Sequence, residues 1–417
     1  MGKTEVFPEI KRLQQDLDTM AGFTDETQPG WTRRAFSNSY EKGRQWLKGE
    51  MEALGMETEY DAASNLIGRI KGSNPGMPCI MIGSHTDTVA GGGRFDGIIG
   101  VLAGLEIVRM LKSEGIRLQH TLEIVDFTAE EPTEFGISTV GSRGMVNSLS
   151  QEMLRRKDST GHTLGDRIKM AGGNPGRIPV DSRNKGDVAV YLELHIEQGP
   201  ILEAAGSHLG LVTGIAGIHR YRVAVEGSPN HAGTTPMDAR CDALTAAAEM
   251  VLCLESICRE TYTETVVGTV GRLNIEPNAA NVIPGRVTFE LEVRSLDTEI
   301  LEKVISRYAE ALKRVSENRH MPFVLECVSK SNAIRIRPEI LQVMENACKP
   351  TSEIRHLFSG AGHDANHLAG IAPIGMIFVP SRNGRSHCPE EWTSIEDVSM
   401  GVKALFNSLL AFDGILD

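Results

Sequence analysis

The sequence has 417 residues, which is long for one hydrophobic core, so we expect two domains. Its 41% of hydrophobic and 24% of charged residues are typical of a folded globular protein and argue against extensive disorder. The formal net charge of -12 argues against binding to nucleic acid or to an anionic membrane, because both need a basic footprint. A small-molecule partner is the better expectation.

The seven cysteines are scattered and include no Cys-x-x-Cys pair. This pattern predicts neither a disulfide framework nor a structural zinc site, and it is typical of reduced thiols in a cytoplasmic protein. No run of about 18 apolar residues occurs in the sequence, so we expect no transmembrane helix.

The first 60 residues predict two amphipathic helices, with the loop signal Pro29-Gly30 between them. From about residue 66 onward, short apolar strands alternate with helices. The predicted elements are strands at 78–84, 120–127 and 188–195 and a helix at about 98–114. This alternation indicates an α/β sheet covered by helices on both faces.

The pattern changes at the glycine-containing segment 214–217. The elements predicted after it are a strand at 220–226, a helix at 242–257, strands at 265–275 and 286–294, a helix at 299–317 and a strand at 322–328. This β-α-β-β-α-β order is typical of a ferredoxin-like α+β unit. The α/β pattern returns near Pro338, with a strand at 373–379 and a closing helix from about residue 395.

We therefore expect one domain made of residues 1–213 and 330–417, with residues 214–329 inserted into it as the second. A four-stranded sheet with helices on one face leaves its other face or an edge free to pair with a second copy. The inserted domain is accordingly the expected interface of a homodimer.

A histidine and two acids follow the strand predicted to end near residue 84. His85 and Asp87 stand two residues apart, so their side chains point to the same face, and Asp96 follows in a glycine-rich loop. Open sheets bind ligands beyond the carboxyl ends of their strands, where these residues would lie. By themselves, His85 and Asp87 fit a surface turn equally well, and Asp96 fits a helix cap. The glycines do not indicate a nucleotide site, because no Gly-Lys-Ser/Thr follows.

Two adjacent acids, Glu130 and Glu131, follow the next predicted strand. Because neighbouring side chains leave a strand in different directions, one can bind a metal ion while the other acts as a general base. A solvated surface turn is the alternative interpretation of this pair.

Two further histidines stand at or after strand ends, so that five candidate ligands come from separate segments. These are His85, Asp96, Glu131, His195 and His387. Three imidazoles and two carboxylates suit zinc, manganese, cobalt or nickel better than calcium. A shared carboxylate implies two ions about 3.5 to 4 Å apart, which generate hydroxide at neutral pH and indicate hydrolytic chemistry.

These motifs resemble those of the di-metal amidohydrolases of the aminoacylase and carboxypeptidase-type superfamily, in particular the hydantoinase/carbamoylase branch. That branch includes N-carbamoyl-L-amino acid hydrolases, β-ureidopropionase and allantoate amidohydrolase. The resemblance extends from about Trp31 to Leu410, and its marker is His195 in Glu-Leu-His-Ile-Glu-Gln-Gly, where related peptidases use a carboxylate ligand. It implies a mixed-sheet catalytic domain with an inserted lid and dimerisation domain.

The resemblance also implies a role for each candidate residue of the catalytic domain. The implied metal ligands are His85 and His195 on different ions, Asp96 as the bridge, and Glu131 and His387 as the remaining ligands. Glu130 would be the general base, and Asp87 its supporting acid.

A substrate half-site in the inserted domain is implied as well. His231 in Asn-His-Ala-Gly-Thr-Thr-Pro-Met would polarise the scissile carbonyl, in its own site or in that of a partner subunit. Asn281 and Arg294 would grip the substrate carboxylate, because a guanidinium matches a carboxylate bidentately. Without the resemblance, His231 fits a helix approach and Arg294 a surface charge. The remaining implied contacts are Gln198 with the ureido group, and Gly360 and His363 from the loop Ser-Gly-Ala-Gly-His-Asp.

The implied activity is removal of the carbamoyl group from an N-carbamoyl-L-amino acid, giving amino acid, carbon dioxide and ammonia. Allantoate amidohydrolase is the alternative with the same ligands. A dipeptidase or aminoacylase is disfavoured by His195, and a non-catalytic protein is disfavoured because Glu130 and all ligands are present. One departure concerns specificity: Glu134 lies where better-known members carry Gly-x-Arg-Phe.

Overall fold

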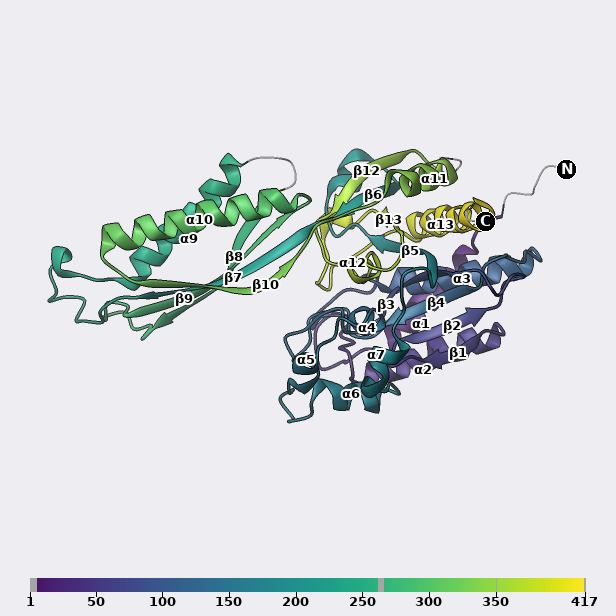
Figure 1. Ribbon diagram of the computed structural model, residues 1–417, viewed down its shortest axis with the longest axis horizontal. Helices are drawn as coiled ribbons and strands as arrows, with labels where there is room; N and C mark the ends of the chain where they lie inside the picture. The colour runs from purple at the N-terminus through teal and green to yellow at the C-terminus, as the bar shows by residue number, and fades with distance from the viewer. Residues whose placement is uncertain (1–5, 262–265, 350, 416–417) are drawn as a thin grey trace. The chain divides into compact units, whose positions relative to one another are not determined.

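The computed structural model describes residues 6–261, 266–349 and 351–415. Among these residues, no helix is both long and apolar enough to cross a membrane. The chain divides into two compact units, which Figure 1 shows with their helices and strands labelled. Unit 1 comprises Met1–Thr213, Ile336–Leu357 and Gly362–Asp417, and unit 2 comprises Gly214–Arg335 and Phe358–Ala361. The catalytic role predicted for the first part and the lid role predicted for the inserted part stay predictions.

A mixed β-sheet forms the centre of the first unit, as predicted. Its strands run in the order β1-β2-β4-β3-β5-β13-β6-β11, and β12 pairs with β6. Their bounds are β1 Glu57–Tyr60, β2 Leu66–Ile70, β3 Cys79–His85, β4 Leu122–Phe127, β5 Val188–Ile196, β6 Leu209–Ile215, β11 Ile334–Arg335, β12 Ile354–Ser359 and β13 Ile374–Val379. The central strands β4, β3, β5 and β13 are parallel to their neighbours in this group, whereas β2 and β6 pair antiparallel at its two sides.

The helices of unit 1 cover this sheet. They are α1 Ile10–Gly22, α2 Asn38–Ala53, α3 Ile98–Ser113, α4 Val140–Met145, α5 Gln151–Arg155, α6 Leu164–Met170, α7 Ile178–Asp181, α8 Ile201–Ala205, α11 Pro338–Cys348, α12 Ala365–Leu368 and α13 Ile395–Ile415. Helix α3 packs against Ser84 of β3 and α13 against Leu194 of β5, each through a glycine. Because side chains alternate along a strand, the next residues, His85 and His195, face the opposite side of the sheet.

The second unit has the predicted β-α-β-β-α-β order. Its elements are β7 Gly217–Glu226, α9 Ala243–Glu260, β8 Val267–Glu276, β9 Arg286–Ser295, α10 Thr298–Arg319 and β10 Phe323–Ser331. The strands form an antiparallel sheet in the order β10-β7-β9-β8. The predicted start of the second strand, Thr265, lies outside the described residues.

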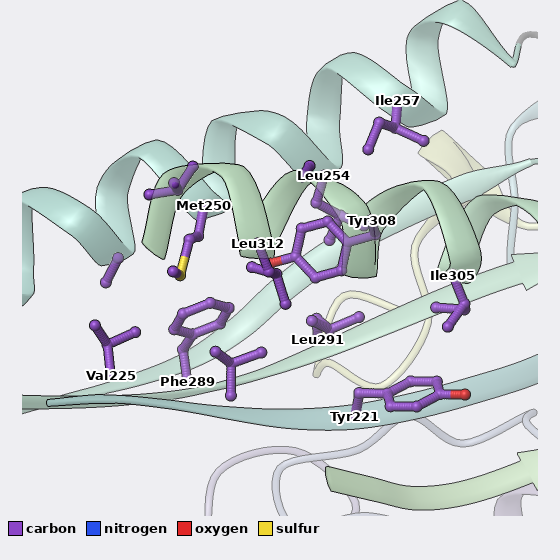
Figure 2. Packing of buried hydrophobic residues seen from close by; sticks show 14 of the residues in the cluster. Tyr221, Val225, Met250, Leu254, Ile257, Phe289, Leu291, Ile305, Tyr308 and Leu312 are labelled. Carbon is purple, nitrogen blue, oxygen red and sulfur yellow. The ribbon is translucent and has the colours of Figure 1, made fainter. Parts of the chain in front are cut away.

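One face of this sheet carries the hydrophobic core of unit 2. Phe289 and Leu291 of β9 point toward α9 and α10, where they meet Met250, Leu254 and Leu312 (Figure 2). These five side chains are at most 2% exposed, so each contributes about 1.5 to 3 kcal/mol of burial free energy. Strand β9 therefore contributes only every second residue to this core. The residues between them can carry polar side chains on the other face of the sheet.

Candidate metal centre

Five segments far apart in the sequence meet at one edge of the mixed sheet. Strands β3, β4, β5 and β13 are parallel neighbours, so their carboxyl ends lie at the same edge. Strand β3 ends at His85, β5 contains His195 next to its end, Glu131 follows β4, and His387 follows β13.

The first group of potential ligands is His85, Asp96 and His195, all of them buried. Their ligand atoms lie within 4.8 Å of one another. Oδ1 of Asp96 lies 3.1 Å from Nε2 of His195 and 3.9 Å from Nε2 of His85. This oxygen and the two imidazoles can therefore coordinate one cation.

The second group is Asp96, Glu131 and His387. Nε2 of His387 lies 3.1 Å from Oδ2 of Asp96 and 3.2 Å from Oε1 of Glu131. Asp96 thus directs one oxygen to each group, which is the arrangement of a carboxylate that bridges two cations. The set of three imidazoles and two carboxylates fits two divalent transition-metal ions.

A third group, Glu193, His195 and His363, also has its ligand atoms within 4.8 Å of one another. Glu193 already accepts hydrogen bonds from Ser84 Oγ at 2.8 Å and from Tyr191 Oη at 2.9 Å. The ring of His363 packs edge-on against that of His195, 4.7 Å away between centroids. Glu193 and His363 therefore lie beside His195, the member that the third group shares with the first.

Backbone carbonyls orient both buried histidines. Nδ1 of His85 lies 3.0 Å from the carbonyl oxygen of Asp87, and Nδ1 of His195 lies 2.9 Å from that of Ile196. Since a carbonyl can only accept, each Nδ1 carries a proton, and each Nε2 faces Asp96, where a cation could take the place of a proton on Nε2. The region near His85 has no room for a larger residue at Gly97, where a Cβ would lie 2.3 Å from Nε2.

Asp87 supports the acid pair through the main chain. Its carboxylate accepts hydrogen bonds from the backbone N–H of Glu130 at 3.2 Å and of Glu131 at 3.1 Å. The turn between β4 and these acids contains Ala129 with a left-handed φ of 53°. Two other residues of the site, Gln198 and His387, also have left-handed φ angles, of 57° and 58°.

The carboxyl groups of the site differ in the direction in which their pKa values are shifted. Burial raises the pKa of Glu130 well above its ordinary value, although His85 opposes the shift, and it raises the pKa of Glu131 to about 7. Burial acts in the same direction on Asp96, but His195, His387 and His85 hold the pKa of Asp96 well below its ordinary range. Oε2 of Glu130 lies 3.7 Å from Nε2 of His85. The pKa values of Glu130 and Glu131 are thus shifted in the opposite direction to that of Asp96.

The residues predicted to bind substrate contact different parts of the chain. Gln198 donates from Nε2 to Oδ2 of Asp96 at 2.8 Å, so in this structure it contacts the carboxylate that the two candidate ligand groups share. His231 and Asn281 are exposed and lie on adjoining segments of unit 2, joined by the hydrogen bond from Ala232 N to the Asn281 carbonyl. Arg294 donates to the carbonyl oxygen of Gly360, also in unit 2, at 2.5 Å.

The unexpected acid Glu134 is neutralised locally. It lies 3.2 Å from Arg34 and accepts a hydrogen bond from Ser159 Oγ at 2.9 Å. Glu134 and Arg34 line a pocket of about 270 Å³ that Asp87 and Glu131 also border. The reversed charge is therefore balanced beside the ligand loop and does not add to the negative charge of the metal centre.

A residue that sequence reasoning missed, Glu391, connects two ligand loops. Its Oε1 accepts from the backbone N–H of Phe95 at 2.9 Å and of Asp96 at 3.1 Å, and its Oε2 accepts from Ser386 Oγ at 2.8 Å and from His387 N–H at 3.4 Å. Only the clustered acids near Ser386-His387 could have signalled it. Glu391 is 2% exposed and holds the backbone of Asp96 and His387, two members of the second group.

The fold and these donor groups define a metal-dependent hydrolase, and the comparisons with known proteins specify it further. An N-carbamoyl-L-amino acid amidohydrolase of Geobacillus stearothermophilus is 39% identical over 400 residues, with 96% of this chain and 97% of the relative covered. Ureidoglycolate hydrolase of Oryza sativa subsp. japonica is 37% identical over 410 residues, covering 97% and 85%. Allantoate amidohydrolase of Bacillus subtilis (strain 168) is 33% identical over 397 residues, covering 94% and 95%.

Structural comparison agrees with these relatives. A hydantoinase/carbamoylase family amidase of Burkholderia multivorans matches with a TM-score of 0.89 and 33% identity, covering 98% of this chain and 99% of that one. The family described as Peptidase family M20/M25/M40 matches residues 81–411. The chain belongs to this peptidase family, in its hydantoinase/carbamoylase branch, and is a metal-dependent hydrolase of amide bonds.

We predict that Glu391→Gln weakens metal binding by about 10- to 100-fold, the range typical of residues that orient ligands. Glu391 now accepts hydrogen bonds from four N–H or O–H groups. The NH2 group of the glutamine amide would face two of these donors and could accept from neither. The matched control is Glu390→Gln, because Glu390 has a 59% exposed side chain and lies near Arg385 instead. Titration of each metal-free protein with Mn²⁺ checks this, and equal affinities would contradict the role of Glu391.

Metal affinity is also expected to rise with pH. A hydrogen bond with Asp96 raises the pKa of His387 to about 9, and burial raises that of Glu131 to about 7. A cation must displace the protons these ligands carry below those values, so affinity increases as pH rises toward about 9 and then levels off. Calorimetric titration in buffers of different ionisation enthalpy measures the released protons. His387→Gln should release fewer protons, and pH-independent affinity would refute the prediction.

Proposed function

We propose that this protein hydrolyses the ureido C–N bond of an N-carbamoyl-L-amino acid, giving the L-amino acid, carbon dioxide and ammonia. The observation that carries the proposal is the placement of Asp96 between the two ligand groups, with Glu130 close to His85. The 39% identical amidohydrolase over nearly the whole chain supports this substrate class.

The five proposed ligands would hold two divalent ions, with Zn, Mn, Co and Ni as the fitting elements. When bound, such ions lower the pKa of water and act as Lewis acids on a carbonyl oxygen. The ions would also lower the pKa of the carboxylates around them, which sets Glu130 to accept a proton at neutral pH.

Glu130 would act as the proton carrier of the reaction. It takes a proton from the attacking water as the new C–O bond forms at the ureido carbonyl, and it gives a proton to the nitrogen that leaves when the C–N bond breaks. Burial favours the protonated form of Glu130, so the proton stays on its carboxyl group between the two steps. Asp87 keeps the backbone of Glu130 in place.

Substrate recognition is assigned to residues with complementary groups. Arg294 and Asn281 would bind the carboxylate, His231 would polarise the scissile carbonyl, and Gln198 would contact the ureido group. Gly360 and His363 complete the proposed substrate set.

The proposal includes a cytoplasmic homodimer formed through unit 2. The four-stranded sheet has β8 and β10 at its edges, and both strands carry exposed apolar residues. Val267 of β8 and Val324 of β10 are 59% and 63% exposed, which supports pairing with a second copy.

Ureidoglycolate and allantoate are the competing substrates, because relatives named for these activities are 37% and 33% identical. All three kinds of substrate carry a ureido group and a carboxylate, so the same ligands and the same arginine serve each of them. They differ in what the central carbon bears, and therefore in the pocket around it.

A parallel assay decides among these substrates. The protein is stripped of metal by chelation, reloaded with Mn²⁺, Co²⁺ or Zn²⁺, and given N-carbamoyl-L-amino acids, allantoate and ureidoglycolate separately. We expect the highest kcat/KM with an N-carbamoyl-L-amino acid. Ammonia release from none of them by metal-loaded protein would refute the proposed function, and a clear preference for either other substrate would reassign it.

Glu130→Gln tests the proton carrier. The amide cannot take up a proton, so kcat should fall by about 10²- to 10⁴-fold while the content of bound metal stays near that of the wild type. Glu134→Gln is the control from the same loop, since Glu134 pairs with Arg34, and it should retain activity within a few-fold. Retained turnover in Glu130→Gln would remove this residue from the mechanism.

A further inference from the structure

The face of the unit 2 sheet opposite its core carries a row of charged side chains. Phe289 and Leu291 point toward the helices (Figure 2), so the alternating residues Glu290, Glu292 and Arg294 of β9 face the other way. This is the face on which the proposed carboxylate-binding arginine stands.

Two acceptors hold the guanidinium of Arg294. Its Nε donates to Oε1 of Glu292 at 2.5 Å, and its Nη1 donates to the carbonyl oxygen of Gly360 at 2.5 Å. Neither contact occupies Nη2. The guanidinium is thus fixed at two points and can still offer N–H groups at its outer end, where a carboxylate binds with two parallel hydrogen bonds.

Glu292 shares its charge with a second arginine. Arg220, the register partner of Glu292 on β7, donates from Nε to Oε2 at 2.5 Å. Two arginines and one carboxylate carry a formal charge of +1, so the cluster still attracts an anion. Burial favours the neutral form of Glu292, but Arg294 and Arg220 lower its pKa, and the carboxylate stays ionised.

We propose that Glu292 is a positioning residue for substrate recognition. It holds Arg294 by Nε with the outer end of the guanidinium free for the substrate carboxylate, while Arg220 compensates its negative charge. This inference rests on the proposed function, because it takes Arg294 as the group that binds the substrate carboxylate.

Two other interpretations make different predictions. If Glu292 competed with the substrate for Arg294, its removal would tighten substrate binding. If Glu292 and Arg294 formed only a surface ion pair, removal of Glu292 would change substrate binding little, since exposed ion pairs contribute weakly. The 24% and 29% exposed side chains of Glu292 and Arg294, and the shared contact with Arg220, favour a fixed arrangement.

The experiment compares Glu292→Leu and Glu292→Gln with a control on the same strand. Leucine removes the acceptor for Nε, so KM for the preferred carboxylate substrate should rise on the order of tenfold or more, with kcat within a few-fold. Glutamine keeps an oxygen that can accept from Nε, and its KM should lie between those of wild type and Glu292→Leu. Glu290→Leu, which removes a carboxylate held by Arg222 at 3.0 Å and by Arg272 at 3.5 Å, should leave KM within about twofold.

A substrate analogue and a direct probe of Arg294 separate the possible outcomes. The carboxamide of the same substrate should be hydrolysed equally poorly by wild type and Glu292→Leu, because it lacks the charge that Arg294 recognises. An unchanged or lowered KM for the carboxylate substrate in Glu292→Leu would overturn the inference, as would an equal rise in Glu290→Leu.

A wild type that hydrolyses no carboxylate substrate refutes the proposed function but not this contact. In that case, hydrogen exchange of the Arg294 Nε–H, followed by NMR in the free protein, decides the inference. Slow exchange in wild type and faster exchange in Glu292→Leu supports it, and equal rates overturn it.

Discussion

The metal centre depends on one buried carboxylate whose two oxygens face different partners. Oδ1 of Asp96 faces His195 and His85, and Oδ2 faces His387. Because Glu130 and Glu131 are buried at the same edge of the sheet, the site concentrates negative charge where water cannot screen it. Divalent cations are the natural counter-charge, so binding of metal and stability of these loops are thermodynamically linked. Asp87 and Glu391 keep the backbone of the ligand loops in place by accepting main-chain N–H groups.

In unit 2, side chains alternate between the two faces of strand β9, which separates core packing from polar contacts. One set of residues on β9, including Phe289, builds the hydrophobic core against α9 and α10. The intervening set carries the arginine that recognises the substrate carboxylate in our proposal, together with the acid that orients it. Core packing and recognition therefore use the same ten-residue strand without competing for side chains.

The sequence predicted those features that depend on local pattern. Apolar runs that end in a histidine located β3 and β5, and the change of periodicity revealed the ferredoxin-like unit. Strands β6 and β12 were not predicted, although they are as long as the predicted strands β3 and β13. Glu391 was also missed, since its partners Phe95 and Asp96 are nearly 300 residues away and offer only backbone N–H groups, which leave no trace in residue type.

Three residues of the site have left-handed backbone φ angles, which lower the stability of the fold. Ala129, Gln198 and His387 adopt φ angles that residues with a Cβ tolerate poorly, at a cost of about 1 to 2 kcal/mol each. At Gln198 and His387 glycine would remove a side chain of the proposed site, whereas at Ala129 it would relieve the strain and leave every proposed ligand in place. It would also let the loop sample other conformations, so the exchange would trade precision for stability. These loops are therefore places where selection for a more heat-resistant chain and selection for a faster enzyme would pull in opposite directions.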